Sequence, residues 1–142
     1  MLRPDALARL TDGAAPWRWK PNRPAAPDAI ARLARAAPAP LPAEYLDLLR
    51  ATDGGEGALG LAPLWLVLWS ADEVVRHGMR SAWPGLLAIG TNGGGETIAF
   101  DVVPSGPWPV VSFDPQGSAD SVRRIAPDAR ALVDAIGLDA PD

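Results

Sequence analysis

The chain has 142 residues, of which 48% are apolar and 21% charged, and its net charge is −4 at pH 7. This length and composition predict one folded domain. The chain contains no cysteine and one histidine, His77, which excludes disulfides, cysteine-ligated metals and sites built from several histidines. A nucleic-acid binder usually carries the opposite net charge, so we expect neither direct nucleic-acid binding nor a cofactor.

Residues 1–26 differ from the rest of the chain, because four prolines and two tryptophans fall within them. Residues 4–10 predict one or two helical turns, and the proline-rich remainder should be extended. We expect Trp17 and Trp19 to pack against the domain, since an exposed pair of tryptophans is costly; the alternative is that they await a partner. We therefore divide the chain into an N-terminal extension, 1–26, and a domain, 27–142.

Two helices are predicted at the start of the domain. Apolar residues recur at helical spacing from residue 27, and Pro38 ends this pattern. Leu41-Pro42 opens a second helix, which the glycine-rich turn at 53–57 ends. The apolar face of this second helix comprises Leu41, Tyr45, Leu48, Leu49 and Thr52.

A buried strand is predicted at 64–69. Alternation along it places Trp65 and Trp69 on one face together with Val67. We expect these tryptophans to pack in the core, and expect the same of Trp108 in a later strand.

A capping box follows this strand directly. Ser70 and Glu73 have the spacing at which a serine side chain and a glutamate side chain each bond the other's backbone amide, so a short helix is predicted over 71–77. His77 lies at its C-terminal end, where a cation is mildly favoured. We prefer this capping role to a catalytic one.

The second half of the chain predicts a meander. Asn92-Gly93 is a strong signal for the tip of a hairpin, and hairpin-length links imply antiparallel pairing. The fold class is therefore α+β: a single domain with a mostly antiparallel sheet of four or five strands, covered by helices. The segments involved are strands at 86–89, 97–103, 108–113 and 122–125, and a last helix at 127–136.

No pattern for catalysis emerges. The glycine pairs lack the Gly-Lys-Ser/Thr ending of a phosphate loop, and no serine stands in a Gly-x-Ser-x-Gly elbow. Arg123-Arg124 is too short for a nucleic-acid groove and fits a solvated edge strand. We assign no catalytic, cofactor or metal residue. The carboxylates near turns, which could pair for catalysis only if the fold brought them together, are Asp53, Glu56, Glu96, Asp101 and Asp114.

Three motifs in this order resemble the SUKH superfamily of Smi–Knr-type domains. They are the helix that begins Leu41-Pro42-Ala-Glu-Tyr45, the turn Asp53-Gly-Gly-Glu-Gly57, and the glycine-rich hairpin from Ile89 to Phe100-Asp101. The resemblance covers about residues 28–137, and Asp53 departs from it because asparagine is commoner there. These motifs are structural, so no catalytic residue is carried over.

This resemblance implies a non-catalytic protein-binding domain. Members are mostly bacterial immunity proteins that neutralise toxins, often nucleases or deaminases, by direct binding. An acidic chain would suit a basic toxin domain as its partner. The alternative is a housekeeping regulator or adaptor without a toxin partner, since fungal members act in cell-wall signalling. The N-terminus does not read as a signal peptide, so we expect a cytoplasmic protein without a membrane segment.

Three residues are candidates for partner binding. Trp83 lies in a predicted loop and could anchor a partner, because tryptophan is favoured at interface hot spots. Glu56 and Glu96 accompany the glycine-rich turns, and turns carry binding residues more often than strands do. An acidic patch around an aromatic anchor would suit a basic partner.

Overall fold

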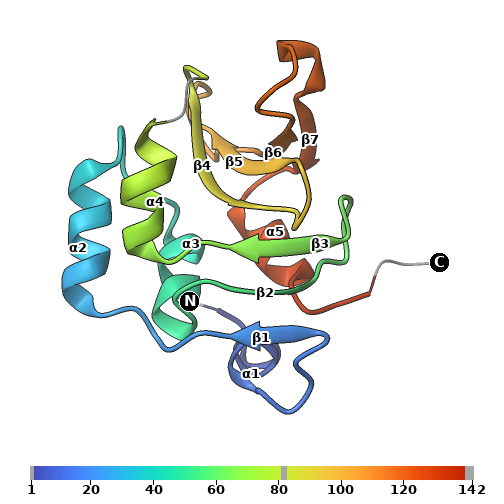
Figure 1. The fold of residues 1–142 in the computed structure, drawn as a ribbon. Coiled ribbons are helices and arrows are strands. Elements are labelled where there is room, and N and C mark those ends of the chain that lie inside the picture. The colour runs from blue at the N-terminus through green and yellow to red at the C-terminus, as the bar shows by residue number, and fades with distance from the viewer. Residues whose placement is uncertain (1, 81–82, 140–142) are drawn as a thin grey trace.

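The computed structural model describes residues 2–80 and 83–139. In that part of the chain it contains five α-helices and a sheet of seven strands (Figure 1). The helices are α1 (Pro4–Thr11), α2 (Pro27–Ala36), α3 (Ala43–Ala51), α4 (Ala71–His77) and α5 (Ala129–Ala135), with 3-10 turns η1 (Gly78–Arg80) and η2 (Ala119–Ser121). The strands are β1 (Trp19–Pro21), β2 (Gly55–Ala58), β3 (Trp65–Leu68), β4 (Leu86–Thr91), β5 (Thr97–Asp101), β6 (Val110–Phe113) and β7 (Arg123–Ala126).

The strands follow one another in the sheet in the order of the sequence, and each pairs antiparallel with the next. The α+β class and the antiparallel sheet are confirmed. The expected number of strands was wrong: the sheet has seven, not four or five. The two additional strands are β1 and β2.

The composition of the two additional strands is not typical of strands, so they were not predicted. β2 is Gly55-Glu-Gly-Ala58, which reads as a turn because glycine is depleted in strands. Gly57 is needed there, because a Cβ at this position would overlap the backbone of Arg18 and Trp19. The strand therefore allows β1 to approach closely. β1 is three residues long and ends in Pro21, as suits an edge strand.

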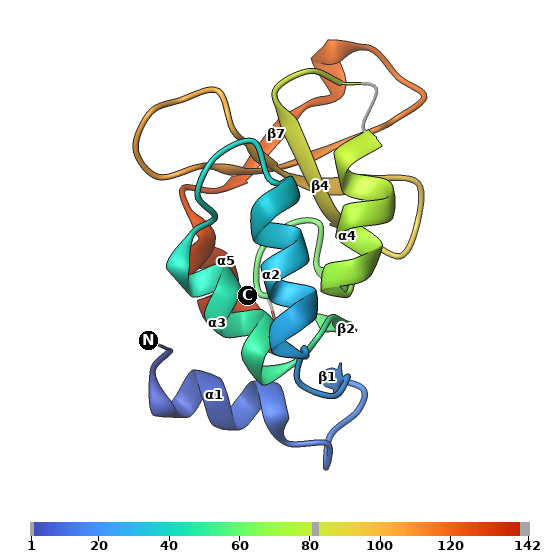
Figure 2. The same ribbon diagram turned by 90° about the vertical axis from the view of Figure 1, so that its left-hand side faces the viewer.

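The helices lie on one side of the sheet. Viewed from that side, α2, α3 and α4 stand in front of the strands (Figure 2). The core lies between the two layers, and Tyr45 of α3 meets Phe100 of β5 edge to face, with ring centroids 5.2 Å apart. The largest fully buried side chains are Trp19, Tyr45, Phe100, Leu10, Leu33, Leu48, Leu49, Leu59, Leu66, Ile89, Ile98 and Leu132.

The segment 1–26 contributes α1 and β1 to this structure. Arg9 of α1 donates from Nε to the Ile136 carbonyl at 2.6 Å, which ties the segment to the end of α5. Trp19 is buried, so its expected packing is confirmed. The same expectation was wrong for Trp17, which is 69% exposed because it stands in the turn before β1, outside the sheet.

Two predictions based on short sequence motifs, the capping box and the hairpin tip, are confirmed. The Ser70 hydroxyl accepts from the Glu73 amide at 3.2 Å and the Glu73 carboxylate accepts from the Ser70 amide at 3.0 Å, which confirms the capping box. The Asn92 amide donates to the Glu96 carbonyl, and Gly93 adopts a positive φ of 79°, which confirms the hairpin tip. No helix among the described residues is long and apolar enough to cross a bilayer.

Candidate functional site

The candidate site is the face of the sheet that the helices leave uncovered, which we call the open face. Side chains alternate along a strand, and Leu66 and Leu68 of β3 are buried in the core. Trp65, Val67 and Trp69 take the alternate positions, are half-buried and lie on the open face. Other residues that share this face by pairing or packing are Lys20, Glu56, Ala58, Ala88, Thr97, Ala99, Val111 and Phe113.

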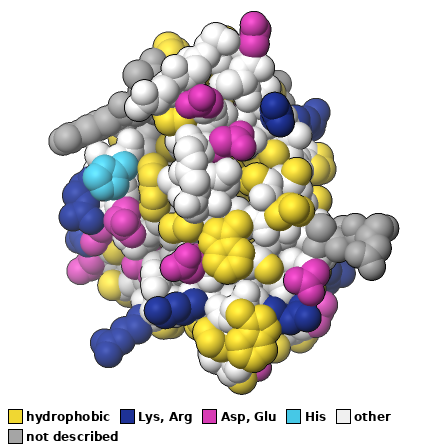
Figure 3. Space-filling view, turned by 45° about the vertical axis from the view of Figure 1, so that its right-hand side comes forward, with side chains coloured by type: hydrophobic (Ala, Val, Ile, Leu, Met, Phe, Trp, Pro, Cys, Tyr) yellow, Lys and Arg dark blue, Asp and Glu magenta, His cyan; other side chains and the backbone are white. Residues whose placement is uncertain are grey.

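The shared face of Trp65, Val67 and Trp69 was predicted correctly, but the expected burial in the core was wrong for Trp65. It is half-buried, because none of the helices in the described part of the chain covers this side of β3. Trp69 is also half-buried, and packs against the margins of two apolar clusters. Trp108 is 7% exposed and packs in the core as expected. Hydrophobic and acidic side chains are interleaved across the middle of the surface in Figure 3, where many of the basic ones lie towards the outline.

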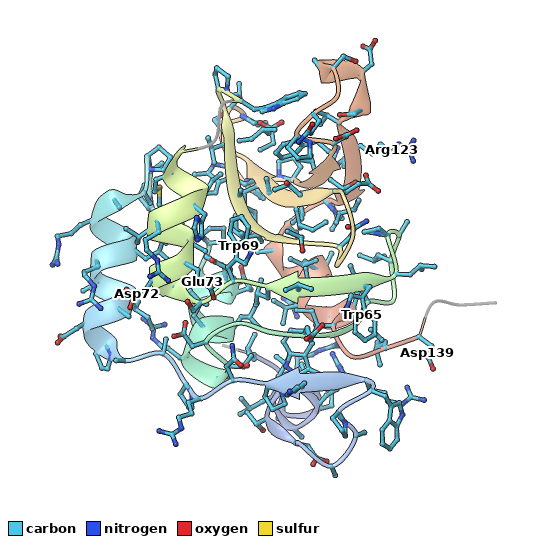
Figure 4. The ribbon with its side chains drawn as sticks, in the orientation of Figure 1. Trp65, Trp69, Asp72, Glu73, Arg123 and Asp139 are labelled. Atoms are coloured by element: carbon cyan, nitrogen blue, oxygen red, sulfur yellow. The ribbon has the colours of Figure 1, made fainter. Side chains whose placement is uncertain are left out.

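A first hollow on the open face, which we call the Glu56 hollow, has a volume of about 210 Å³. Glu56 reaches it because β2 pairs it with Lys20 on one side and Val67 on the other. Trp69 and Glu73 lie close together where β3 passes into α4, while Trp65 lies at the other end of the strand (Figure 4). The hollow is lined by Lys20, Asn22, Gly55, Glu56, Val67, Leu68, Trp69 and Glu73.

A second hollow, which we call the aromatic hollow, adjoins the first because Trp69 lines both. Its volume is about 160 Å³. His77 meets the Trp69 ring edge to face at 5.7 Å, and Trp83 packs against Phe113 at 5.1 Å between ring centroids. The residues that line it are Trp69, His77, Trp83, Ala88, Thr97, Phe113 and Pro115.

The structure places two of the three expected partner-binding residues on the open face. Glu56 is exposed in the first hollow, and Trp83 lines the second while half-buried against Phe113. Glu96 is the last residue of the loop between β4 and β5, where its carboxylate accepts from the Asn92 side chain at 3.4 Å, and it lines neither hollow. Trp69 joins the two hollows.

Negative charge gathers beside the Glu56 hollow. Burial raises the pKa of the Asp53 carboxyl, the hydrogen bond from the Ala71 amide at 2.7 Å opposes this, and the charges of Asp72 and Glu73 raise the pKa further. Burial also raises the pKa of the Tyr45 phenol, and the Asp53 charge adds to that shift. Burial is the largest cause of both pKa shifts, and the neighbouring carboxylates add to it.

The other turn carboxylates have local roles. Asp101 accepts from the Val103 amide at 3.1 Å, and Asp114 accepts from the Gln116 amide at 2.9 Å. Such bonds shape turns. Among the described residues there is no group of three or more His, Cys, Asp or Glu side chains that could hold a metal ion.

A larger pocket of about 410 Å³ lies away from the open face, between the loop before α3, the loop before β6 and the start of α5. Asp128 there accepts from the Ala131 amide at 2.8 Å and caps α5. None of the three expected partner-binding residues lines it. The pocket is formed by Pro40, Pro42, Glu44, Gly106, Pro107, Trp108, Asp128, Ala129 and Arg130.

Sequence reasoning missed Lys20 and the second role of Glu73. Lys20 was overlooked because β1 was not predicted. Glu73 was interpreted as a capping residue only, although it also lines the Glu56 hollow. The alternation around Val67 was the available signal, since it identifies the residues that face outward if that side of β3 is uncovered.

The comparisons with known proteins agree with the resemblance seen in the sequence. The model of the SMI1 / KNR4 family (SUKH-1) matches residues 24–135. None of the curated proteins matches this chain. The family match spans most of the chain and includes six of the seven strands described above, β2 to β7. The chain therefore belongs to the SMI1 / KNR4 (SUKH-1) family.

Proposed function

We propose that this chain is a non-catalytic, immunity-type domain that neutralises a toxic protein by binding it with the open face of the sheet. The observation that carries the proposal is the position of Trp69, which joins the Glu56 hollow to the aromatic hollow on the open face. Family membership supports a domain of this type.

The chemistry of the open face suits a protein partner. Trp65, Trp69 and Trp83 are half-buried, so each is partly packed and keeps part of its surface accessible. Tryptophan is enriched among residues that dominate binding energy, typically near the centre of an interface with polar residues around it. Lys20 and Glu56 supply polar groups beside these rings.

The single histidine and three of the five turn carboxylates are engaged in structural contacts. His77 packs against Trp69, and the carboxylates of Asp53, Asp101 and Asp114 accept backbone amides. These contacts support a binding role. A basic nuclease or deaminase domain is the proposed partner, because a net charge of −4 would speed its association.

Co-expression with a toxin encoded beside this chain tests the proposal. The wild type should restore growth and bind the toxin, and Trp69→Ala and Glu56→Lys should both fail while remaining folded. Trp17→Ala is the matched control, because it removes an exposed tryptophan that lines neither hollow.

The outcomes separate the alternatives. If Trp17→Ala fails and Trp69→Ala protects, the partner surface is the segment 1–26 and not the open face. If no toxin is encoded nearby and the chain co-purifies with a metabolic or cell-wall protein, the adaptor function replaces the immunity function. An activity that His77→Ala abolishes would overturn the non-catalytic claim.

A further inference from the structure

We infer that the Glu56 hollow binds the guanidinium group of an arginine side chain presented by the partner protein. This inference rests on the function proposed above and names the chemical group that the open face recognises. It follows from the kinds of side chain that line one hollow of about 210 Å³.

Two carboxylates from different elements line the hollow: Glu56 from β2 and Glu73 from α4. Glu56 is exposed. Glu73 uses Oε1 to accept from the Ser70 amide at 3.0 Å, and a carboxylate can accept several hydrogen bonds, so it retains capacity for a ligand. The capping box holds this carboxylate in place.

Trp69 forms the aromatic wall of the hollow. A cation above an indole ring is attracted by the ring quadrupole. His77 contacts the ring edge to face at 5.7 Å, so the indole is supported on the side of the aromatic hollow. The wall is therefore oriented before any ligand arrives.

The charged residues that line the hollow leave it with one net negative charge. Among the residues that the structure describes, Lys20 is the only lysine or arginine lining the hollow, against the acidic residues Glu56 and Glu73. The Asn22 side chain is already engaged, since it donates to the Asp53 carbonyl at 2.9 Å. A second cation restores neutrality.

The start of α4 does not oppose a cation strongly. A helix N-terminus is positive, but Asp53 accepts from the Ala71 amide at 2.7 Å and places a carboxylate there. Arg32 pairs with Asp72 at 3.2 Å on the outer side of α4 and does not line the hollow. The Asp53 carboxylate therefore offsets the positive end of α4 and adds to the negative charge beside the hollow.

Arginine fits these groups better than lysine. Its planar guanidinium presents donors in several directions and stacks on aromatic rings, whereas the ammonium of lysine is a compact, strongly hydrated charge. Two acidic residues on separate elements and a tryptophan line the same hollow, and this set of groups suits the planar guanidinium.

A titration without any partner tests the inference. The intact protein, ¹⁵N-labelled, would be titrated with Nα-acetyl-arginine amide, and the neutral isostere Nα-acetyl-citrulline amide would serve as the control ligand. We expect saturable shifts at the Trp69 indole N–H and the Glu56 and Glu73 amides with the arginine compound only.

Two variants should change the affinity for the arginine compound in opposite directions. Glu56→Gln should weaken binding by roughly threefold or more, the scale of one exposed cation–π or ion-pair contact. Lys20→Gln should tighten it, because a competing cation is removed; a merely structural role for Lys20 would not produce tighter binding. Asp120→Asn, an exposed carboxylate in η2, should leave affinity unchanged.

Equal shifts with citrulline, shifts centred away from Trp69, or unchanged affinity in both Glu56→Gln and Lys20→Gln would overturn the inference. Equal affinity for Nα-acetyl-lysine amide would overturn the preference for arginine. If the arginine compound causes no chemical-shift changes but Trp69→Ala loses toxin binding, the arginine site is wrong and the proposed function still stands.

Discussion

The two faces of the seven-stranded sheet are built from the same strands but differ in burial along β3 and its continuation to Trp69. On the covered face, Leu66, Ile98 and Phe100 are fully enclosed beneath the helices. On the open face, Trp65 and Trp69 are only half-buried although they are the largest side chains of their segment. The covered face therefore supplies stability, and the open face has apolar surface left for a partner.

The open face is itself uneven. Towards β4, β5 and β6 it carries a small apolar cluster of Ala88, Ala99, Val111 and Phe113, over which Trp83 packs. Towards β1 and β2 it is polar and includes Lys20 and Glu56. A partner that covers this face would thus meet an aromatic half and a charged half.

The largest expected effect lies on the covered side. Leu49 of α3 is fully buried, so Leu49→Ala should lower the free energy of unfolding by about 2–5 kcal/mol through lost burial and a cavity. Urea denaturation would measure it. Leu7→Ala, in a leucine that is 44% exposed on α1, is the matched control and should change stability by less than about 0.5 kcal/mol. Similar losses of unfolding free energy in the two variants would contradict the placement of Leu49 in the core.

A smaller loss is expected where β1 joins the sheet. Gly57→Ala would drive a Cβ into the backbone of Arg18 and Trp19, and overpacking of this kind costs about 1–3 kcal/mol. Thermal or urea unfolding would measure the loss. Gly95→Ala meets no atom within 4 Å of its new Cβ and should be close to neutral. If Gly57→Ala is as stable as Gly95→Ala, the close approach of β1 to β2 is wrong.

On the open face, the expected effect shifts from stability to binding. Trp69→Ala should raise the dissociation rate of a bound partner at least tenfold, or about 1.4 kcal/mol, while costing less unfolding free energy than Leu49→Ala. Surface-binding kinetics and urea denaturation of the same preparations would give both quantities. A variant that unfolds as easily as Leu49→Ala but still binds normally would reverse the assignment of the two faces.

The smallest expected effect concerns pH. The pKa of Asp53 is raised in the folded chain by burial and by Asp72 and Glu73, so the folded state holds this proton more tightly than the unfolded state does. The stability that it contributes is fully present below the unfolded pKa of about 3.9 and is lost as pH rises through the folded pKa.

Asp53→Asn should remove this contribution, because the side chain of the variant does not titrate. Its amide oxygen can still accept from the Ala71 amide, so the hydrogen bond is kept without a charge. The stability of the variant relative to the wild type should therefore increase as pH rises from about 4 towards neutrality. Urea denaturation at a series of pH values would show this. Parallel pH profiles for the two proteins would contradict the raised pKa.

Local interactions explain which predictions succeeded. The capping box of Ser70 and Glu73 and the tip at Asn92-Gly93 depend on contacts within a few residues, so their sequence signals were sufficient. β1 and β2 depend on each other across more than thirty residues of chain. Neither segment has the sequence of a typical strand, and each forms a strand through its pairing in the sheet.

That Trp65, Val67 and Trp69 share a face follows from their spacing alone, because the two-residue period of a strand is a property of the backbone. The sequence could not determine which face would be covered, since that depends on where α2 to α5 pack after the chain folds. Only the tertiary structure placed the helices opposite these side chains and brought Lys20, Glu56 and Glu73 around Trp69. Local periodicity is encoded residue by residue, whereas the hollow is assembled from segments that meet only through long-range packing.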